Sequence, residues 1–111
     1  MPTQQAIQRW FNRTYSQKGL AYLRPPEFYS VFMEYLGVTR GDRVLDVGCG
    51  PGLLLKQALE RGAFAHGVDV SESALAMVPD QAPGAHVSLC SGEALCWPNS
   101  FFDYVTCIGV F

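Results

Sequence analysis

The sequence predicts an α/β fold built on a parallel sheet, because strand-like and helix-like segments alternate along it. Residues 43–47 are apolar and β-prone around one charge, and residues 53–61 follow with the pattern of a helix. A second strand is predicted at 64–70, and a helix at 72–78 comes after it. Strands that alternate with helices favour a parallel sheet with right-handed crossovers.

Two further strands complete the predicted sheet, at 86–89 and 103–110. In the 103–110 strand both alternating sets of side chains are largely apolar, which predicts a strand covered on both faces. Ser71 is expected to cap the 72–78 helix at its start, and Pro79 is expected to close it. His66 and His86 lie beside strands with no second ligand nearby, so we expect structural roles for them.

Two helices are predicted ahead of the sheet. Residues 4–17 have helical spacing of apolar and aromatic side chains, and Gly19 follows as a stop. The next helix begins at the Pro25–Pro26 pair and ends at Gly37. We therefore expect an N-terminal helical segment over 1–37 and a sheet-containing part over 38–111.

Length and composition favour one small globular domain. The chain has 111 residues, of which 49% are hydrophobic and 16% charged. The net charge is −2 and basic residues do not cluster, so nucleic acid and anionic membranes are not favoured as partners. No apolar run approaches the roughly 20 residues of a membrane-spanning helix.

The four cysteines form no C-x-x-C pair, which disfavours a zinc site. Cys49 lies in a glycine-rich loop and Cys107 in an apolar strand, where small buried thiols are common. Reduced cysteines of this kind are typical of a cytoplasmic protein.

The loop after the first strand predicts a binding site. It contains Gly48, Gly50 and Gly52 and opens into a helix, so the backbone can approach a nucleotide-like ligand closely. A dinucleotide fingerprint would need a third glycine where Leu53 stands. Asp46, just ahead of the loop, suits a ligand whose amino-acid end carries an ammonium group. Equally, Asp46 could organise the loop by accepting backbone N–H bonds.

Asp69 is a candidate for binding a ribose. It ends the second predicted strand 17 residues after Gly52 (69 − 52), close to the offset at which a carboxylate meets a ribose in dinucleotide-binding folds. Val70 would then lie against the adenine. The alternative is a turn or capping role for Asp69 just ahead of Ser71.

Three motifs together resemble class I S-adenosylmethionine-dependent methyltransferases. The first is D-x-G-x-G-x-G over 46–52, and the second is GVDVS over 67–71. The third, over 91–111, resembles the G-D-A-E-A-L-P-F-P-D-x-S-F-D run of small-molecule methyltransferases of the ubiquinone and menaquinone type. The matching positions are Glu93, Ala94, Leu95, Pro98, Phe102 and Asp103. The Gly-Asp of that run is replaced by Cys90-Ser91, and its next Ala by Gly92.

The resemblance implies S-adenosylmethionine as the cofactor and no metal. Ser91 would accept a hydrogen bond from the adenine amino group without a charge, and Glu93 would be a solvated acid with the cofactor contact made by the backbone at Gly92. The implied cofactor-binding residues are Asp46, Gly48, Cys49, Gly50, Gly52, Asp69, Val70, Ser91, Gly92, Glu93 and Ile108. No residue is assigned as a general base.

The implied function is methyl transfer to a small-molecule acceptor by in-line displacement, in which the protein mainly holds donor and acceptor in place. The implied fold is a Rossmann-like methyltransferase sheet, with its first four strands in the order 3-2-1-4. Because the fourth strand is normally central in this fold, we expect a truncated chain whose open edge could self-associate. One alternative is a cofactor-binding fragment without independent catalysis, which needs a partner chain or the missing C-terminal half. A fragment of a nicotinamide dehydrogenase is disfavoured by Leu53.

Overall fold

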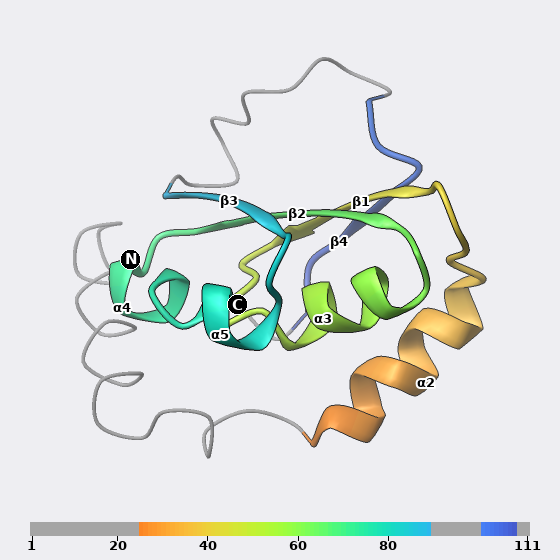
Figure 1. Ribbon diagram of the computed structural model, residues 1–111, viewed down its shortest axis with the longest axis horizontal. Coiled ribbons are helices and arrows are strands. Elements are labelled where there is room, and N and C mark those ends of the chain that lie inside the picture. Colours follow the sequence, from red (N-terminus) through yellow and green to blue (C-terminus); the bar gives the residue numbers. More distant parts are fainter. Residues whose placement is uncertain (1–24, 90–100, 109–111) are drawn as a thin grey trace, which may run out of the picture.

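A computed structural model describes residues 25–89 and 101–108 of the chain. Within them, four parallel strands form one sheet in the order β3-β2-β1-β4 (Figure 1). The strands are β1 (Arg43–Val47), β2 (Phe64–Asp69), β3 (His86–Leu89) and β4 (Tyr104–Thr106). The expected α/β fold and strand order are confirmed.

The register of the sheet places one residue from each of the four described strands in a row. Leu45 of β1 lies opposite His66 of β2 on one side and Val105 of β4 on the other. His66 in turn lies opposite His86 of β3. Because side chains alternate between the faces of a strand, these four residues share one face of the sheet.

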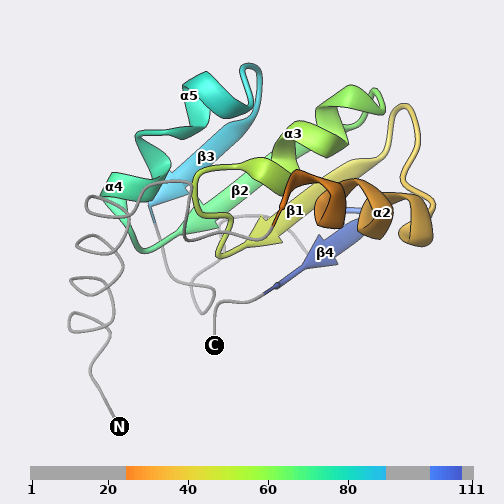
Figure 2. The same ribbon diagram turned by 90° about the horizontal axis from the view of Figure 1, so that it is seen from below.

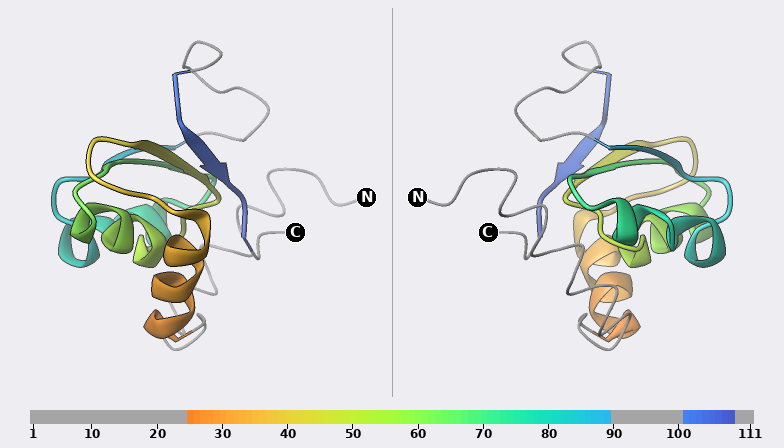
Figure 3. Two further views of the ribbon diagram at one scale, coloured as in Figure 1. Left: turned by 90° about the vertical axis from the view of Figure 1, so that its right-hand side faces the viewer. Right: turned by 90° about the vertical axis from the view of Figure 1, so that its left-hand side faces the viewer.

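The four described helices all cover the other face, as Figures 2 and 3 show. They are α2 (Pro26–Leu36), α3 (Leu53–Glu60), α4 (Glu72–Leu75) and α5 (Val78–Gln81). Helix α2 has proline in its first turn and ends at Gly37, whose φ of 79° lets its N–H bond to the carbonyls of Met33 and Glu34. None of the described helices is long and apolar enough to cross a membrane.

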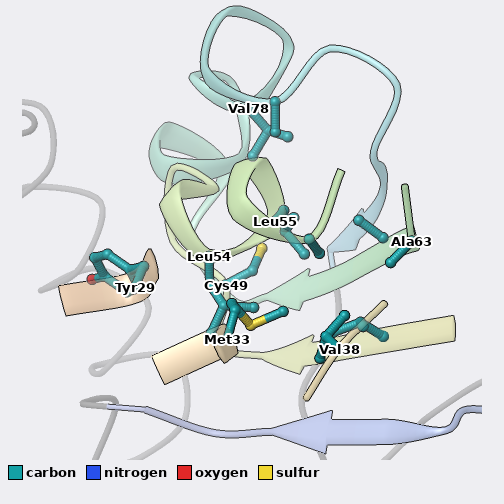
Figure 4. Packing of buried hydrophobic residues seen from close by; sticks show 12 residues of the cluster. Tyr29, Met33, Val38, Cys49, Leu54, Leu55, Ala63 and Val78 are labelled. Atoms are coloured by element: carbon teal, nitrogen blue, oxygen red, sulfur yellow. The ribbon is translucent and has the colours of Figure 1, made fainter. Parts of the chain in front are cut away.

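The hydrophobic core lies between these helices and the sheet (Figure 4). Met33 of α2 and Leu55 of α3 are fully buried against Val44 of β1. Tyr104 of β4 packs against the same cluster from the edge of the sheet. Helices α2 and α3 therefore share one core with the sheet. This packing holds the start of α3, and the loop before it, in place.

Two details of the expected secondary structure are wrong. The helix predicted at 72–78 is divided into α4 and α5. Ser71 caps α4 as expected, because its hydroxyl accepts the N–H of Ala74. Pro79 does not close a helix but lies in the first turn of α5, where its missing N–H leaves no bond unmade.

The fourth strand is also not covered on both faces. Val105 is 60% exposed, whereas Thr106 on the helix-bearing face is buried. The physical reason is that every described helix packs against the other side of the sheet. The helix predicted over 4–17 and Gly19 lie outside the described residues.

Candidate functional site

The loop that joins β1 to α3 has a backbone that depends on glycine. Gly48, Gly50 and Gly52 have φ angles of 75°, 56° and 99°, which residues with a Cβ atom rarely adopt. At Gly52 a side chain would also come within 3.4 Å of Val78 of α5. The three glycines therefore allow the chain to turn tightly from the strand into the helix.

The loop uses its own N–H groups within the protein. Gly48 and Cys49 both donate to the carbonyl of Val68 in β2, over 2.7 and 3.0 Å. Gly52 donates to Cys49, and Gly50 donates to a carboxylate oxygen of Asp69 over 2.8 Å. A phosphate-binding loop instead presents its N–H groups to the anion. This loop is therefore poorly suited to a pyrophosphate.

Close packing against β2 holds the loop in place, and it depends on Gly67. A Cβ atom at this position would lie 2.7 Å from the Cys49 sulfur and 2.8 Å from a methyl group of Leu55. The sequence reasoning did not single out Gly67 for this role. A glycine inside a strand is a pattern that indicates close approach of another chain segment, so the sequence contained a usable clue.

Asp69, at the end of β2, connects the loop to the next turn. One oxygen of its carboxylate accepts the N–H of Gly50, and the other accepts the N–H of Ser71, each over 2.8 Å. Asp69 is buried, and burial raises its pKa although these backbone bonds act to lower it. The turn role proposed as an alternative is thus present. A carboxylate has about four acceptor positions, so a bond from a ribose hydroxyl is compatible with these backbone bonds.

Asp46 of β1 is buried beside the same loop, with 4% of its surface exposed. The hydroxyl of Thr106 in β4 donates to its Oδ1 over 2.7 Å. The pKa of Asp46 is raised to about 7, mainly by burial; the Thr106 bond acts to lower it, and the charge of Asp69 contributes to the rise. In the described residues the donor to Asp46 is therefore a side chain of a neighbouring strand and not a loop amide.

Asp46 and Asp69 together form a buried acidic pair at the carboxyl ends of two adjacent strands. Within 25–89 and 101–108, neither carboxylate has an ion-pair partner. The thiol of Cys49 lies close enough for both charges, after burial, to raise its pKa. The thiol is therefore neutral, and any negative charge at this site is carried by Asp46 and Asp69.

The other candidate residues are distributed around this pair. Val70 is half-buried directly after Asp69, and Ile108 is half-buried against the core cluster beyond β4. Ser91, Gly92 and Glu93 lie outside the described residues. Thr106 was missed by the sequence reasoning, since it lies 60 positions from Asp46 and nothing local marks it.

The two histidines lie in an aromatic cluster on the other face of the sheet. The rings of His66 and His86 stack 5.3 Å apart, and Phe101 and Phe102 pack edge-on against His66. Arg43 lies over the Phe101 ring. The part of the chain that the structure describes contains no group of three or more potential metal ligands.

A parallel sheet ordered 3-2-1-4, a glycine loop after β1 and acids at two adjacent strand ends together define a Rossmann-like methyltransferase fold. Comparison with known protein families supports the same fold assignment. The model of the methyltransferase domain family matches residues 44–111, and that of protein-L-isoaspartate(D-aspartate) O-methyltransferase matches residues 4–73. The chain belongs to the methyltransferase domain family. The resemblance to class I S-adenosylmethionine-dependent methyltransferases is confirmed.

Curated relatives share this part of the sequence. An uncharacterized methyltransferase, YdaC of Bacillus subtilis, is 42% identical over 74 residues, which cover 63% of this chain and 41% of that protein. A ubiquinone biosynthesis O-methyltransferase of Coxiella burnetii is 32% identical over 105 residues, covering 91% of this chain and 44% of that protein. The chain thus spans less than half the length of these relatives.

A solved structure supports the fold. Magnesium protoporphyrin IX methyltransferase (ChlM) from Synechocystis PCC 6803, crystallised with bound SAM (S-adenosylmethionine), has a TM-score of 0.76 and 18% identity. The match covers 96% of this chain and 62% of that one. At this identity the likeness concerns the fold alone.

Proposed function

We propose that this chain binds S-adenosylmethionine at the carboxyl ends of β1 and β2, and that the protein transfers the methyl group to a small-molecule acceptor. The observation that carries the proposal is the buried acidic pair of Asp46 and Asp69, which has no cationic partner in the described residues. It lies beside a glycine loop whose N–H groups are already bonded within the protein.

The charge of the site matches this cofactor better than a dinucleotide. S-adenosylmethionine carries positive charge at its sulfonium and ammonium groups and has no phosphate. A cation close to a buried carboxylate favours the ionised form and offsets the effect of burial. A nicotinamide dinucleotide would instead bring a pyrophosphate next to two acids and a loop without free N–H donors. The residues present therefore fit S-adenosylmethionine.

Each candidate residue has a proposed role. Asp69 accepts from the ribose hydroxyls while it keeps the loop in place, and Val70 lies against the adenine. Asp46 faces the ammonium-bearing end of the cofactor, and the backbone of Gly48, Cys49, Gly50 and Gly52 allows its close approach. Ile108 contacts the cofactor from the end of β4. Ser91 and the backbone of Gly92 complete the adenine contacts, and Glu93 is a solvated acid beside them.

The chemistry needs no metal in this proposal. The bound cofactor supplies a methyl group that is already activated by its sulfonium leaving group. The residues of this chain bind and orient the cofactor so that an acceptor atom can approach in line. The small-molecule acceptor is supported by the similarity to the Coxiella relative, a ubiquinone biosynthesis O-methyltransferase.

We also propose a cytoplasmic location, and a division of the chain into an N-terminal helical segment over residues 1–37 and a cofactor-binding part over residues 38–111.

A second candidate is a cofactor-binding unit that acts only together with a partner chain. Among the described strands β4 pairs only with β1, so its other edge is not paired with any of them. An exposed strand edge can pair with another copy of the chain. Light scattering across a concentration series tests this idea. A mass that stays monomeric at all concentrations would argue against self-pairing through β4.

The proposed function is tested by calorimetric titration of the chain with S-adenosylmethionine, with NAD as the control. We expect saturable binding of S-adenosylmethionine and binding of NAD at least about tenfold weaker, a difference of about 1.4 kcal/mol. Binding of NAD in preference to S-adenosylmethionine would contradict the proposal.

The ribose contact is best tested by changing the ligand, since replacing Asp69 would also release the loop from Gly50. S-adenosylhomocysteine and its 2′-deoxy analogue form the matched pair. We expect the analogue to bind about tenfold more weakly, because a hydrogen bond to a charged group is lost. Equal affinities for the two ligands would contradict the proposal that Asp69 binds the ribose.

A further inference from the structure

Thr106 and Asp46 form a contact that joins two strands directly beside the proposed cofactor site. The two residues lie opposite each other in the register of β4 and β1. The Thr106 hydroxyl is 2.7 Å from Oδ1 of Asp46 and 3.4 Å from the carbonyl of Leu45. A hydroxyl has one hydrogen, and the short contact with a carboxylate is the stronger of the two.

The contact between Thr106 and Asp46 is buried. Asp46 is 4% exposed and Thr106 is 7% exposed, so water contributes little to either. Thr106 is the donor to Asp46 within the described residues. Threonine is branched at Cβ, and its side chain therefore has few rotamers available in a strand. The Thr106 hydroxyl consequently donates a hydrogen bond to the carboxylate of Asp46 and also fixes its orientation.

From this geometry we infer that Thr106 is a positioning residue, which holds the Asp46 carboxylate ionised and oriented for the ammonium-bearing end of the cofactor. The inference rests on the proposed function and adds a residue from the fourth strand to a site otherwise built on β1 and β2. Thr106 acts through Asp46 and does not itself touch the cofactor.

The electrostatics of the surroundings give the inference a measurable consequence. Burial raises the pKa of Asp46 to about 7, and the Thr106 bond opposes that rise. The other titratable groups that interact with Asp46 are Asp69, whose charge contributes to this rise, and the thiols of Cys49 and Cys107. Loss of the hydroxyl would therefore leave a smaller ionised fraction of Asp46 near neutral pH, and cation binding would need a higher pH.

The experiment compares Thr106→Val, which removes the hydroxyl at nearly constant shape, with Thr106→Ser, which keeps it. Val105→Thr is the matched control, since Val105 lies next to it in β4 and is exposed on the other face. The ligands are S-adenosylhomocysteine, which has the ammonium group, and 5′-methylthioadenosine, which lacks the amino-acid end. Affinities are measured by calorimetry from pH 6 to pH 8.5, with circular dichroism to confirm folding.

We expect Thr106→Val to weaken S-adenosylhomocysteine binding about five- to tenfold at pH 7, within the range for the net loss of one hydrogen bond. The loss should shrink toward pH 8.5, where Asp46 ionises without help. Thr106→Ser and Val105→Thr should bind within about twofold of the unaltered chain, which is the variation expected when no specific bond is lost. Methylthioadenosine should bind equally to all four proteins.

Two outcomes would overturn the inference. One is equal binding of S-adenosylhomocysteine by the Thr106→Val variant and the unaltered chain at every pH. The other is an equal loss for methylthioadenosine, which would indicate a general disturbance of the site. Failure of the unaltered chain to bind either ligand would instead contradict the proposed function. In that case the pKa of the Asp46 carboxyl group is measured by carbon NMR in both chains. An unchanged pKa in Thr106→Val would disprove the effect of the Thr106 hydroxyl on Asp46.

Discussion

The turns that follow β1 and β2 are built in parallel ways but anchor their acids differently. Asp46 precedes the first turn and Asp69 the second, and burial raises the pKa of both. Asp69 is held by backbone N–H groups of Gly50 and Ser71. Asp46 is held by a single side-chain hydroxyl, that of Thr106 in β4.

The carboxylate of Asp69 stabilises the fold through its hydrogen bonds, whereas the ionised carboxylate of Asp46 destabilises it. Two buried N–H groups would lose their partner without Asp69, so its carboxylate has a structural reason to be there. Asp46 satisfies no backbone group in the described residues, and its burial is unfavourable in the ionised form. Because Asp46 lowers stability and satisfies no backbone group in the described residues, a functional role best explains it. Three substitutions test this comparison.

The largest effect is expected for Asp69→Ala. The free energy of unfolding should fall by about 2–3 kcal/mol at pH 7, because the buried N–H groups of Gly50 and Ser71 both lose their acceptor. Asp69→Asn keeps one acceptor oxygen and should lose about half as much. Urea denaturation followed by circular dichroism measures both. A change below about 0.5 kcal/mol for the alanine variant, the range of neutral surface substitutions, would show that water replaces the carboxylate.

A somewhat smaller effect is expected for Gly67→Ala, which tests how tightly the loop is packed against β2. The added Cβ would lie 2.7 Å from the sulfur of Cys49, so overpacking should lower the free energy of unfolding by about 2 kcal/mol. Gly41→Ala is the control, since its Cβ would meet nothing within 4 Å but its φ is +86°. That control should lose about 1 kcal/mol from backbone strain alone. Equal losses in the two variants would mean that the loop yields to the new methyl group.

The smallest effect, and one of opposite sign, is expected for Asp46→Asn. We expect it to raise the free energy of unfolding at pH 8 by about 1–2 kcal/mol and to leave it unchanged at pH 4. A rise of one pKa unit corresponds to about 1.4 kcal/mol, and the buried amide keeps part of the desolvation penalty. The Thr106 hydroxyl can still donate to the amide oxygen.

The sign follows from the titration of Asp46. Its pKa is about 7 in the folded chain and near 3.8 when it is unperturbed. The unfolded chain therefore loses this proton first as the pH rises, and the folded state is progressively disfavoured between about pH 4 and pH 7. Above pH 7 the difference is constant. Urea titrations of the two chains at pH 4, 6 and 8 would contradict the prediction if their difference did not change with pH.

Local patterns in the sequence accounted for most of the fold. The strand at 86–89, the cap at Ser71 and the helix end at Gly37 agree with the structure, because each depends on residues a few positions apart. The single helix expected over 72–78 was wrong, since Pro79 is compatible both with ending one helix and with beginning the next. The cover expected on both faces of β4 was wrong because the composition of a strand does not determine what packs on it.

The sequence by itself determined the class of fold, the glycine loop and the two acids at the strand ends. Only the tertiary structure decided what holds those acids. Asp69 bonds to Gly50 at 19 positions' separation, and Asp46 bonds to Thr106 at 60. Backbone conformation is governed by neighbouring residues and leaves a readable pattern. The partner of a buried side chain depends on the register of adjacent strands, which is set only when the whole sheet packs against its helices.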